Sequence, residues 1–177
     1  MNNRISLILT IVFCILLGTF QVEAQTKRTS KRAEKKAQIE KEFWAYSQLL
    51  QTKTFKFEAV MAHSAEFPSV DINPTHNTVE MINGVAEASL SFFGRSTSSN
   101  TRGNAGSIEF YGVVENYKVE INERKKTIKA SFQIRDKQDF FTCSLNVDSK
   151  GYTYFNVASQ FKSYISYTGQ IFRLKTD

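Results

Sequence analysis

Two arginines offer the most useful chemistry in this sequence. Arg95 and Arg102 lie in a stretch of Ser, Thr, Asn and Gly that has neither the alternation of a strand nor the period of a helix. A loop of this length inside a domain is usually functional or mobile, and a guanidinium can bind a carboxylate or phosphate through two parallel hydrogen bonds. The loop therefore predicts an anion-binding group. In the alternative interpretation, Arg95 pairs with a nearby acid or carbonyl and only holds the loop.

Aromatic residues flank this loop on both sides. Phe93 precedes it, and Phe110 and Tyr111 follow it. Aromatic walls with a few polar groups are typical of small-molecule pockets, although the same residues also suit a plain core. The predicted ligand-binding residues are Arg95, Arg102, Phe93, Phe110 and Tyr111.

No catalytic residue, metal site or cofactor is predicted. The two histidines are His63, after a strand end, and His76, in a turn, and no His or Cys pair has the spacing of a metal or redox motif. The loop from Gly94 to Gly106 lacks the Gly-Lys-Ser/Thr of a phosphate-binding loop. Carboxylates could still do acid–base work, but the sequence cannot bring together Glu109, Glu115, Glu120 and Asp139. A carboxylate-dependent hydrolase or transferase acting on an envelope substrate is the alternative to a binding protein.

The first 24 residues predict a secretory signal peptide. Arg4 gives a positive start, an apolar run extends from Ile5 to Leu17, and Val22 and Ala24 stand three and one residues before the expected cleavage point. The apolar run is shorter than the roughly 20 residues that a spanning helix needs. We therefore expect no transmembrane segment after cleavage and a periplasmic or secreted protein.

Cleavage leaves one cysteine and a basic tail. Cys14 is lost with the signal, so Cys143 remains, on an apolar strand face that predicts a buried thiol. The formal net charge is +6, and basic residues concentrate in a predicted flexible tail over residues 25–36. This tail can contact anionic surfaces, but nucleic acid is not expected as a partner because the charge does not spread over the fold. The predicted partner is a small molecule or an envelope protein.

The remaining sequence, residues 37–177, predicts one β-rich domain that includes an N-terminal helix. Ile39, Phe43, Tyr46 and Leu50 form an apolar stripe at helical spacing, which predicts a helix from about Lys31 to Gln51 that packs across a sheet or plugs one end of a barrel. From Thr54 onward the period is two, which predicts eight or nine short strands.

Turn residues separate these strands. Asn83-Gly84 predicts a hairpin, Gly151 suits a left-handed turn position, and Glu115-Asn116 predicts a tight turn. Alternation with one polar face is typical of an antiparallel sheet. The predicted fold is mainly β: an antiparallel meander of about eight or nine strands that forms a barrel or a strongly curved sheet, with one N-terminal amphipathic helix. An outer-membrane barrel is disfavoured, because the outward positions carry Lys, Glu and Gln.

Three stretches together resemble a known family. They are Ser91-Phe92-Phe93-Gly94-Arg95, Gly106-Ser107-Ile108-Glu109-Phe110 and Ile165-Ser166-Tyr167-Thr168-Gly169-Gln170-Ile171. They are similar to domain-of-unknown-function family 4251, a family of secreted Bacteroidetes proteins. The resemblance implies a cell-envelope location and a shared fold, and it implies no activity. Together with the residue patterns, it favours a periplasmic, non-enzymatic binding or scaffold module.

Overall fold

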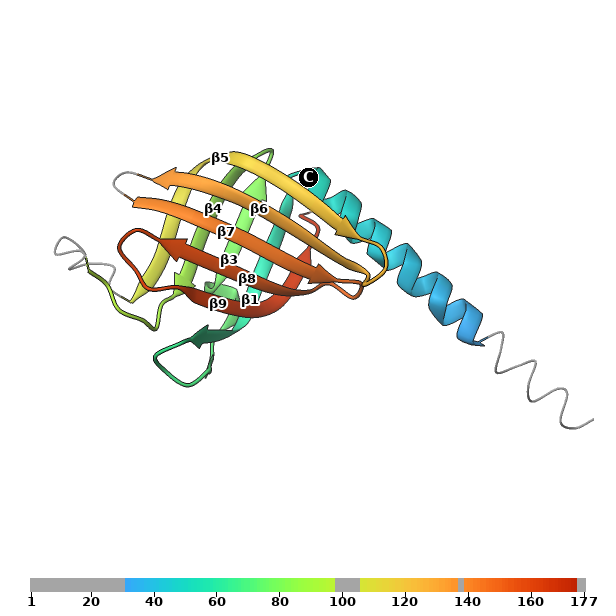
Figure 1. Ribbon diagram of the computed structural model, residues 1–177, viewed down its shortest axis with the longest axis horizontal. Coiled ribbons are helices and arrows are strands. Elements are labelled where there is room, and N and C mark those ends of the chain that lie inside the picture. Colours follow the sequence, from blue (N-terminus) through green and yellow to red (C-terminus); the bar gives the residue numbers. More distant parts are fainter. Residues whose placement is uncertain (1–30, 98–105, 137–138, 175–177) are drawn as a thin grey trace, which may run out of the picture. The chain divides into compact units, whose positions relative to one another are not determined.

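The alternating sequence from Phe55 onward forms antiparallel strands in a computed structural model, which describes residues 31–97, 106–136 and 139–174 (Figure 1). The described residues contain nine strands and one short 3₁₀ helix, η1 (Pro74–His76). The strands are β1 (Phe55–Ser64), β2 (Val70–Asp71), β3 (Thr78–Ile82), β4 (Val85–Ser91), β5 (Ser107–Asn122), β6 (Thr127–Asp136), β7 (Asp139–Asp148), β8 (Tyr152–Ser159) and β9 (Ile165–Phe172).

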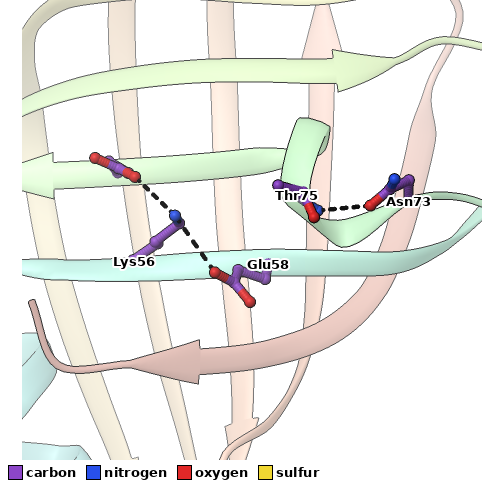
Figure 2. A network of polar contacts seen from close by, with 5 residues as sticks. Lys56, Glu58, Asn73 and Thr75 are labelled. Carbon is purple, nitrogen blue, oxygen red and sulfur yellow. Dashed lines mark hydrogen bonds and ion pairs between the residues drawn. The ribbon is translucent and has the colours of Figure 1, made fainter.

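The sheet closes on itself because β1 pairs with both β3 and β9. The order around the barrel is β1-β3-β4-β5-β6-β7-β8-β9, and each neighbouring pair is antiparallel. The short β2 pairs with Met61 and Ala62 on the edge of β1 that also meets β3. Between β2 and β3 lies η1, where the Asn73 side chain accepts a hydrogen bond of 3.0 Å from the Thr75 backbone N–H (Figure 2). The predicted meander is confirmed, and the described strands form a closed barrel.

Apolar side chains from the inward positions form one cluster inside the barrel. Phe57, Phe155 and Tyr167 are fully buried there, with ring centroids 5.6 Å apart for Phe57–Phe155 and 6.4 Å for Phe155–Tyr167. Eight strands make a barrel whose interior is about wide enough for side chains to occupy. Cys143 belongs to the same cluster, which confirms the predicted buried thiol.

Residues 31–51 are helical, in agreement with the sequence prediction. The helical residues 31–40 and 41–51 belong to two different compact units, and residues 41–51 share theirs with the strands. In that unit Phe43 and Leu50 are fully buried, the Tyr117 hydroxyl donates to the Leu50 carbonyl at 2.5 Å, and the Tyr46 hydroxyl donates to the Lys150 carbonyl at 3.3 Å. The end of the helix therefore covers the barrel end that holds the β5–β6 and β7–β8 turns.

The predicted tight turn at Glu115-Asn116 is wrong. Strand β5 continues for 16 residues, and its register with β6 shifts between Glu115 and Lys118, which is a β-bulge. Asn116 has φ +53° there. Asn is one of the few side chains that tolerate this conformation, both in turns and in bulges, so the local sequence does not distinguish the two. Asn83-Gly84 does form the predicted hairpin, with φ values of +51° and +83°.

No helix among the described residues is long and apolar enough to cross a membrane. The predicted signal peptide, residues 1–24, lies outside the described residues.

Candidate functional site at the barrel rim

The segment after β4, residues 92–97, forms a strap over the barrel end opposite the helix. It is paired with the connection between β8 and β9: the Ser163 N–H donates to the Arg95 carbonyl at 2.9 Å, and the Thr97 N–H donates to the Phe161 carbonyl at 2.8 Å. Strands β3 and β1 lie between β4 and β9, where this connection ends. The strap and the connection therefore meet at the barrel end although they follow strands that are not neighbours.

Aromatic rings pack tightly beneath the strap. Phe92 is buried, and a Cβ at Gly94 would overlap both the Phe92 ring and the Ser163 hydroxyl. The Tyr167 hydroxyl donates from inside the barrel to the Ser91 carbonyl at 2.9 Å. These contacts fix the path of the chain just before Arg95.

Lys162 links the strap to β5. Its ammonium donates to the Ser107 carbonyl and lies 5.4 Å from the centre of the Phe92 ring. Desolvation by burial lowers the pKa of Lys162, while the nearby Asp139 and Glu109 carboxylates oppose this shift. The lysine thus holds the two ends of the β4–β5 connection together.

Arg95 has a fixed backbone and an exposed side chain. Its N–H donates to Ser163 Oγ at 3.1 Å and its carbonyl accepts from Ser163, yet its side chain is 82% exposed. The guanidinium contacts Glu66 through Nε, 3.3 Å from Glu66 Oε2. An exposed ion pair of this kind contributes at most about 1 kcal/mol. Such a group can exchange Glu66 for the carboxylate or phosphate of a ligand.

The structure does not gather all the predicted ligand-binding residues at one place. Phe93 is part of the strap and packs half-buried against the core. Phe110 points into the barrel, with its ring centroid 5.1 Å from that of Phe141. Tyr111 points outward from the same strand and is 66% exposed, as strand alternation requires. Arg102 lies outside the described residues. Arg95 and Phe93 share the strap, whereas Phe110 and Tyr111 lie on opposite faces of β5.

Sequence reasoning missed the residues that hold the strap and its neighbours. Glu66 and Ser163 are far from Arg95 in sequence, and no local pattern marks them as its partners. Asp139 accepts hydrogen bonds from the Gln160 N–H at 3.1 Å and the Ser159 hydroxyl at 2.6 Å, so this acid anchors the β8–β9 connection. His63 lies within β1, where its ring nitrogens are 2.8 Å from Ser69 Oγ and 3.1 Å from Thr168 Oγ1.

The fold is thus a closed antiparallel meander barrel whose rim carries a strap with an exposed arginine. The family model described as "Domain of unknown function (DUF4251)" matches residues 34–171, so the chain belongs to this family and the predicted family is confirmed. The chain is also similar to the crystal structure of a DUF4251 family protein from Bacteroides eggerthii DSM 20697 at 1.95 Å resolution. The TM-score is 0.61 at 15% identity, over 75% of this chain and 87% of that chain, which shows a shared fold. A search of curated proteins found no match.

Proposed function

We propose that this protein is a non-enzymatic binding module of the cell envelope that holds an anionic group of its ligand at Arg95. The observation that carries this proposal is the contrast between the Arg95 backbone, which hydrogen-bonds Ser163 through both N–H and carbonyl, and its side chain, which is 82% exposed. Binding to a group on an ordered backbone loses less conformational entropy than binding to a group on a free loop. The predicted signal peptide supports the envelope location.

The chemistry of the rim favours a carboxylate or phosphate. A planar guanidinium matches either group with two parallel hydrogen bonds. Glu66 already places a carboxylate beside Nε, and this contact indicates where a ligand oxyanion would lie. Phe93, two residues earlier in the strap, adds apolar surface for the rest of a small molecule.

Titration of the mature protein with acetate and inorganic phosphate tests the rim site, with the backbone amide resonances of residues 92–97 and 161–163 followed by NMR. These resonances are expected to shift saturably, and R95Q should abolish the shifts. E66Q should strengthen binding, because it removes the competing carboxylate. R135Q is the matched control, since Arg135 lies on the outer wall with its guanidinium 5.3 Å from the Phe140 ring.

Two results would overturn the proposal. One is acetate and phosphate binding that R95Q leaves unchanged, or that R135Q weakens to the same degree. The other is recovery of the uncleaved protein in the cytoplasmic fraction of its native cell, which would remove the envelope location.

A further inference from the structure

Three tyrosines project from one part of the outer wall. Tyr152 and Tyr154 occupy outward positions of β8, where they are 60% and 59% exposed, and the buried Thr153 lies between them. Tyr164, in the β8–β9 connection, is 57% exposed. We define the tyrosine face as these three residues together with the outward positions of residues 142–146 in β7 and 166–170 in β9.

Uncharged hydrogen-bonding groups surround these rings. In the strand register, Tyr154 lies between Asn146 of β7 and Thr168 of β9, and Tyr152 lies opposite Gln170. The outward positions that flank Tyr154 and Asn156 are neutral and polar, whereas Tyr152 also adjoins Asp148 at the end of β7. The neutral positions are Thr142, Ser144, Asn146, Ser166, Thr168 and Gln170. The tyrosine face therefore has no formal charge, in a chain with a net charge of +6.

Charged side chains begin at the borders of this face. On β1, the next strand after β9, Lys56 lies 3.3 Å from Glu58 and 3.1 Å from Glu80 of β3 (Figure 2). At the β7–β8 turn, the Asp148 carboxylate accepts from the Lys150 N–H at 2.7 Å and from the Tyr152 N–H at 3.0 Å. The neutral composition is thus a property of this part of the wall and not of the whole surface.

Hydrogen bonds fix one end of the face before any ligand binds. The Tyr164 hydroxyl donates to Asn156 Oδ1 at 2.7 Å, and the Asn156 amide donates to Ser144 Oγ at 3.3 Å. Asn156 follows Tyr154 at the next outward position of β8, so the row from Tyr152 to Asn156 is about 13 Å long at roughly 3.3 Å per residue. An elongated ligand can lie along this row.

We propose that the tyrosine face binds an uncharged polysaccharide chain. A pyranose ring has an apolar C–H face, which stacks on a tyrosine ring, and a rim of hydroxyls, which both donate and accept hydrogen bonds. The phenol, amide and hydroxyl groups of the face supply both kinds of partner. This site goes beyond the proposed function, because it uses the outer faces of β7, β8 and β9 and requires neither Arg95 nor an anionic ligand.

Other occupants fit the face less well. The buried core of a protein interface is more apolar than its rim, whereas each ring here stands beside hydroxyl or amide groups. Nucleic acid and anionic lipid require basic side chains, and the outward positions of the face hold none. The neutral charge of the face complements a neutral chain.

Calorimetric titration of the mature protein tests the proposal with hexasaccharides of β-1,4-linked glucose, mannose and N-acetylglucosamine, and with hexagalacturonate as the anionic comparison. At least one neutral hexasaccharide is expected to bind more tightly than hexagalacturonate. The double variant Y152A/Y154A should lower its association constant about tenfold. Y152F/Y154F should retain most of the affinity, because it keeps both rings.

Y111A is the matched control: Tyr111 is equally exposed on β5, outside both the strap and the tyrosine face. R95Q should also leave hexasaccharide binding unchanged, so the two binding proposals can fail separately. Thermal unfolding checks that each variant is folded.

The proposal is overturned if no neutral hexasaccharide binds, if Y152A/Y154A binds like the wild type, or if Y111A weakens binding equally. A dimer that dissociates in Y152A/Y154A would assign the face to a second copy of the chain instead.

Discussion

Among the glycines that the structure describes, Gly169 is the one at which an added methyl group would come closest to another atom, and that atom belongs to the backbone. A Cβ there would overlap the Glu58 carbonyl and come within 2.9 Å of the Ala59 Cα, both backbone atoms of β1. These atoms cannot move without disturbing the β1–β9 ladder that closes the barrel. We expect G169A to lower the free energy of unfolding by about 3 kcal/mol, measured by urea denaturation.

Gly106 provides the control for that change. A Cβ at Gly106 would meet no atom within 4 Å, so G106A should alter the free energy of unfolding by no more than about 0.5 kcal/mol. Equal urea midpoints for G169A and G106A would contradict the close approach at Gly169.

For single residues, the sequence predicted which side chains face inward or outward along a strand, because this follows from alternation. It did not predict contacts between residues that are far apart in the chain. Gly169 pairs with Ala59 beside the register shift in β1 between Ala59 and Met61, and a glycine inside a strand pattern commonly marks such a bulge. The fixed backbone of Arg95 could not be predicted, because Ser163 lies 68 residues away. The outward positions of Tyr152 and Tyr154 could have been found, since the intervening Thr153 and the following Phe155 have the inward parity of β8.

At the scale of elements, the bulge in β5 connects the barrel wall to the helix. Beside Asn116, Tyr117 packs partly buried against the core, with its ring 6.2 Å from Phe132 and its hydroxyl 2.5 Å from the Leu50 carbonyl. Y117F keeps the ring but leaves that carbonyl without the hydroxyl donor. We expect a loss of about 1 kcal/mol in the free energy of unfolding and faster amide hydrogen exchange in residues 47–51.

The exposed Tyr154 gives the comparison for this prediction. Y154F removes a hydroxyl from the outer wall and should change neither the free energy of unfolding nor exchange in the helix. If Y117F behaves like Y154F, the bond to Leu50 contributes nothing to holding the helix on the barrel.

The helix and the hairpins were predictable because their signals lie within a few residues, as at Asn83-Gly84. Closure of the barrel was not predictable, because it requires β1 to pair with β9 across more than 100 residues, and the sequence equally allowed a curved open sheet. The strap also depends on distant residues: residues 92–97 have no strand pattern, and hydrogen bonds to residues 161–163 fix their path.

For the whole molecule, the burial of weak acids should lower the free energy of unfolding at alkaline pH. Desolvation raises the pKa of Tyr117, Tyr167 and Cys143 well above their ordinary values. In the unfolded chain these groups titrate near their ordinary pKa values, about 10 for Tyr and about 8.5 for Cys. Their contribution to stability is therefore complete below those values. It falls as pH rises toward the folded-state pKa, because only the unfolded chain then releases the proton.

This linkage predicts a steep loss of stability above about pH 10, with an earlier component from Cys143 above about pH 8.5. Between its unfolded-state and folded-state pKa, each group adds a slope of about 1.4 kcal/mol per pH unit.

Y167F should lower the free energy of unfolding by about 1 kcal/mol at pH 7, because the bond to the Ser91 carbonyl is lost. It should also flatten the slope between about pH 10 and 12, while C143A flattens the slope between about pH 8.5 and 10. Urea unfolding at a series of pH values measures both effects. Identical slopes in Y167F and the wild type would mean that ionisation of Tyr167 is not coupled to unfolding, and that the strap end of the barrel admits water to this phenol.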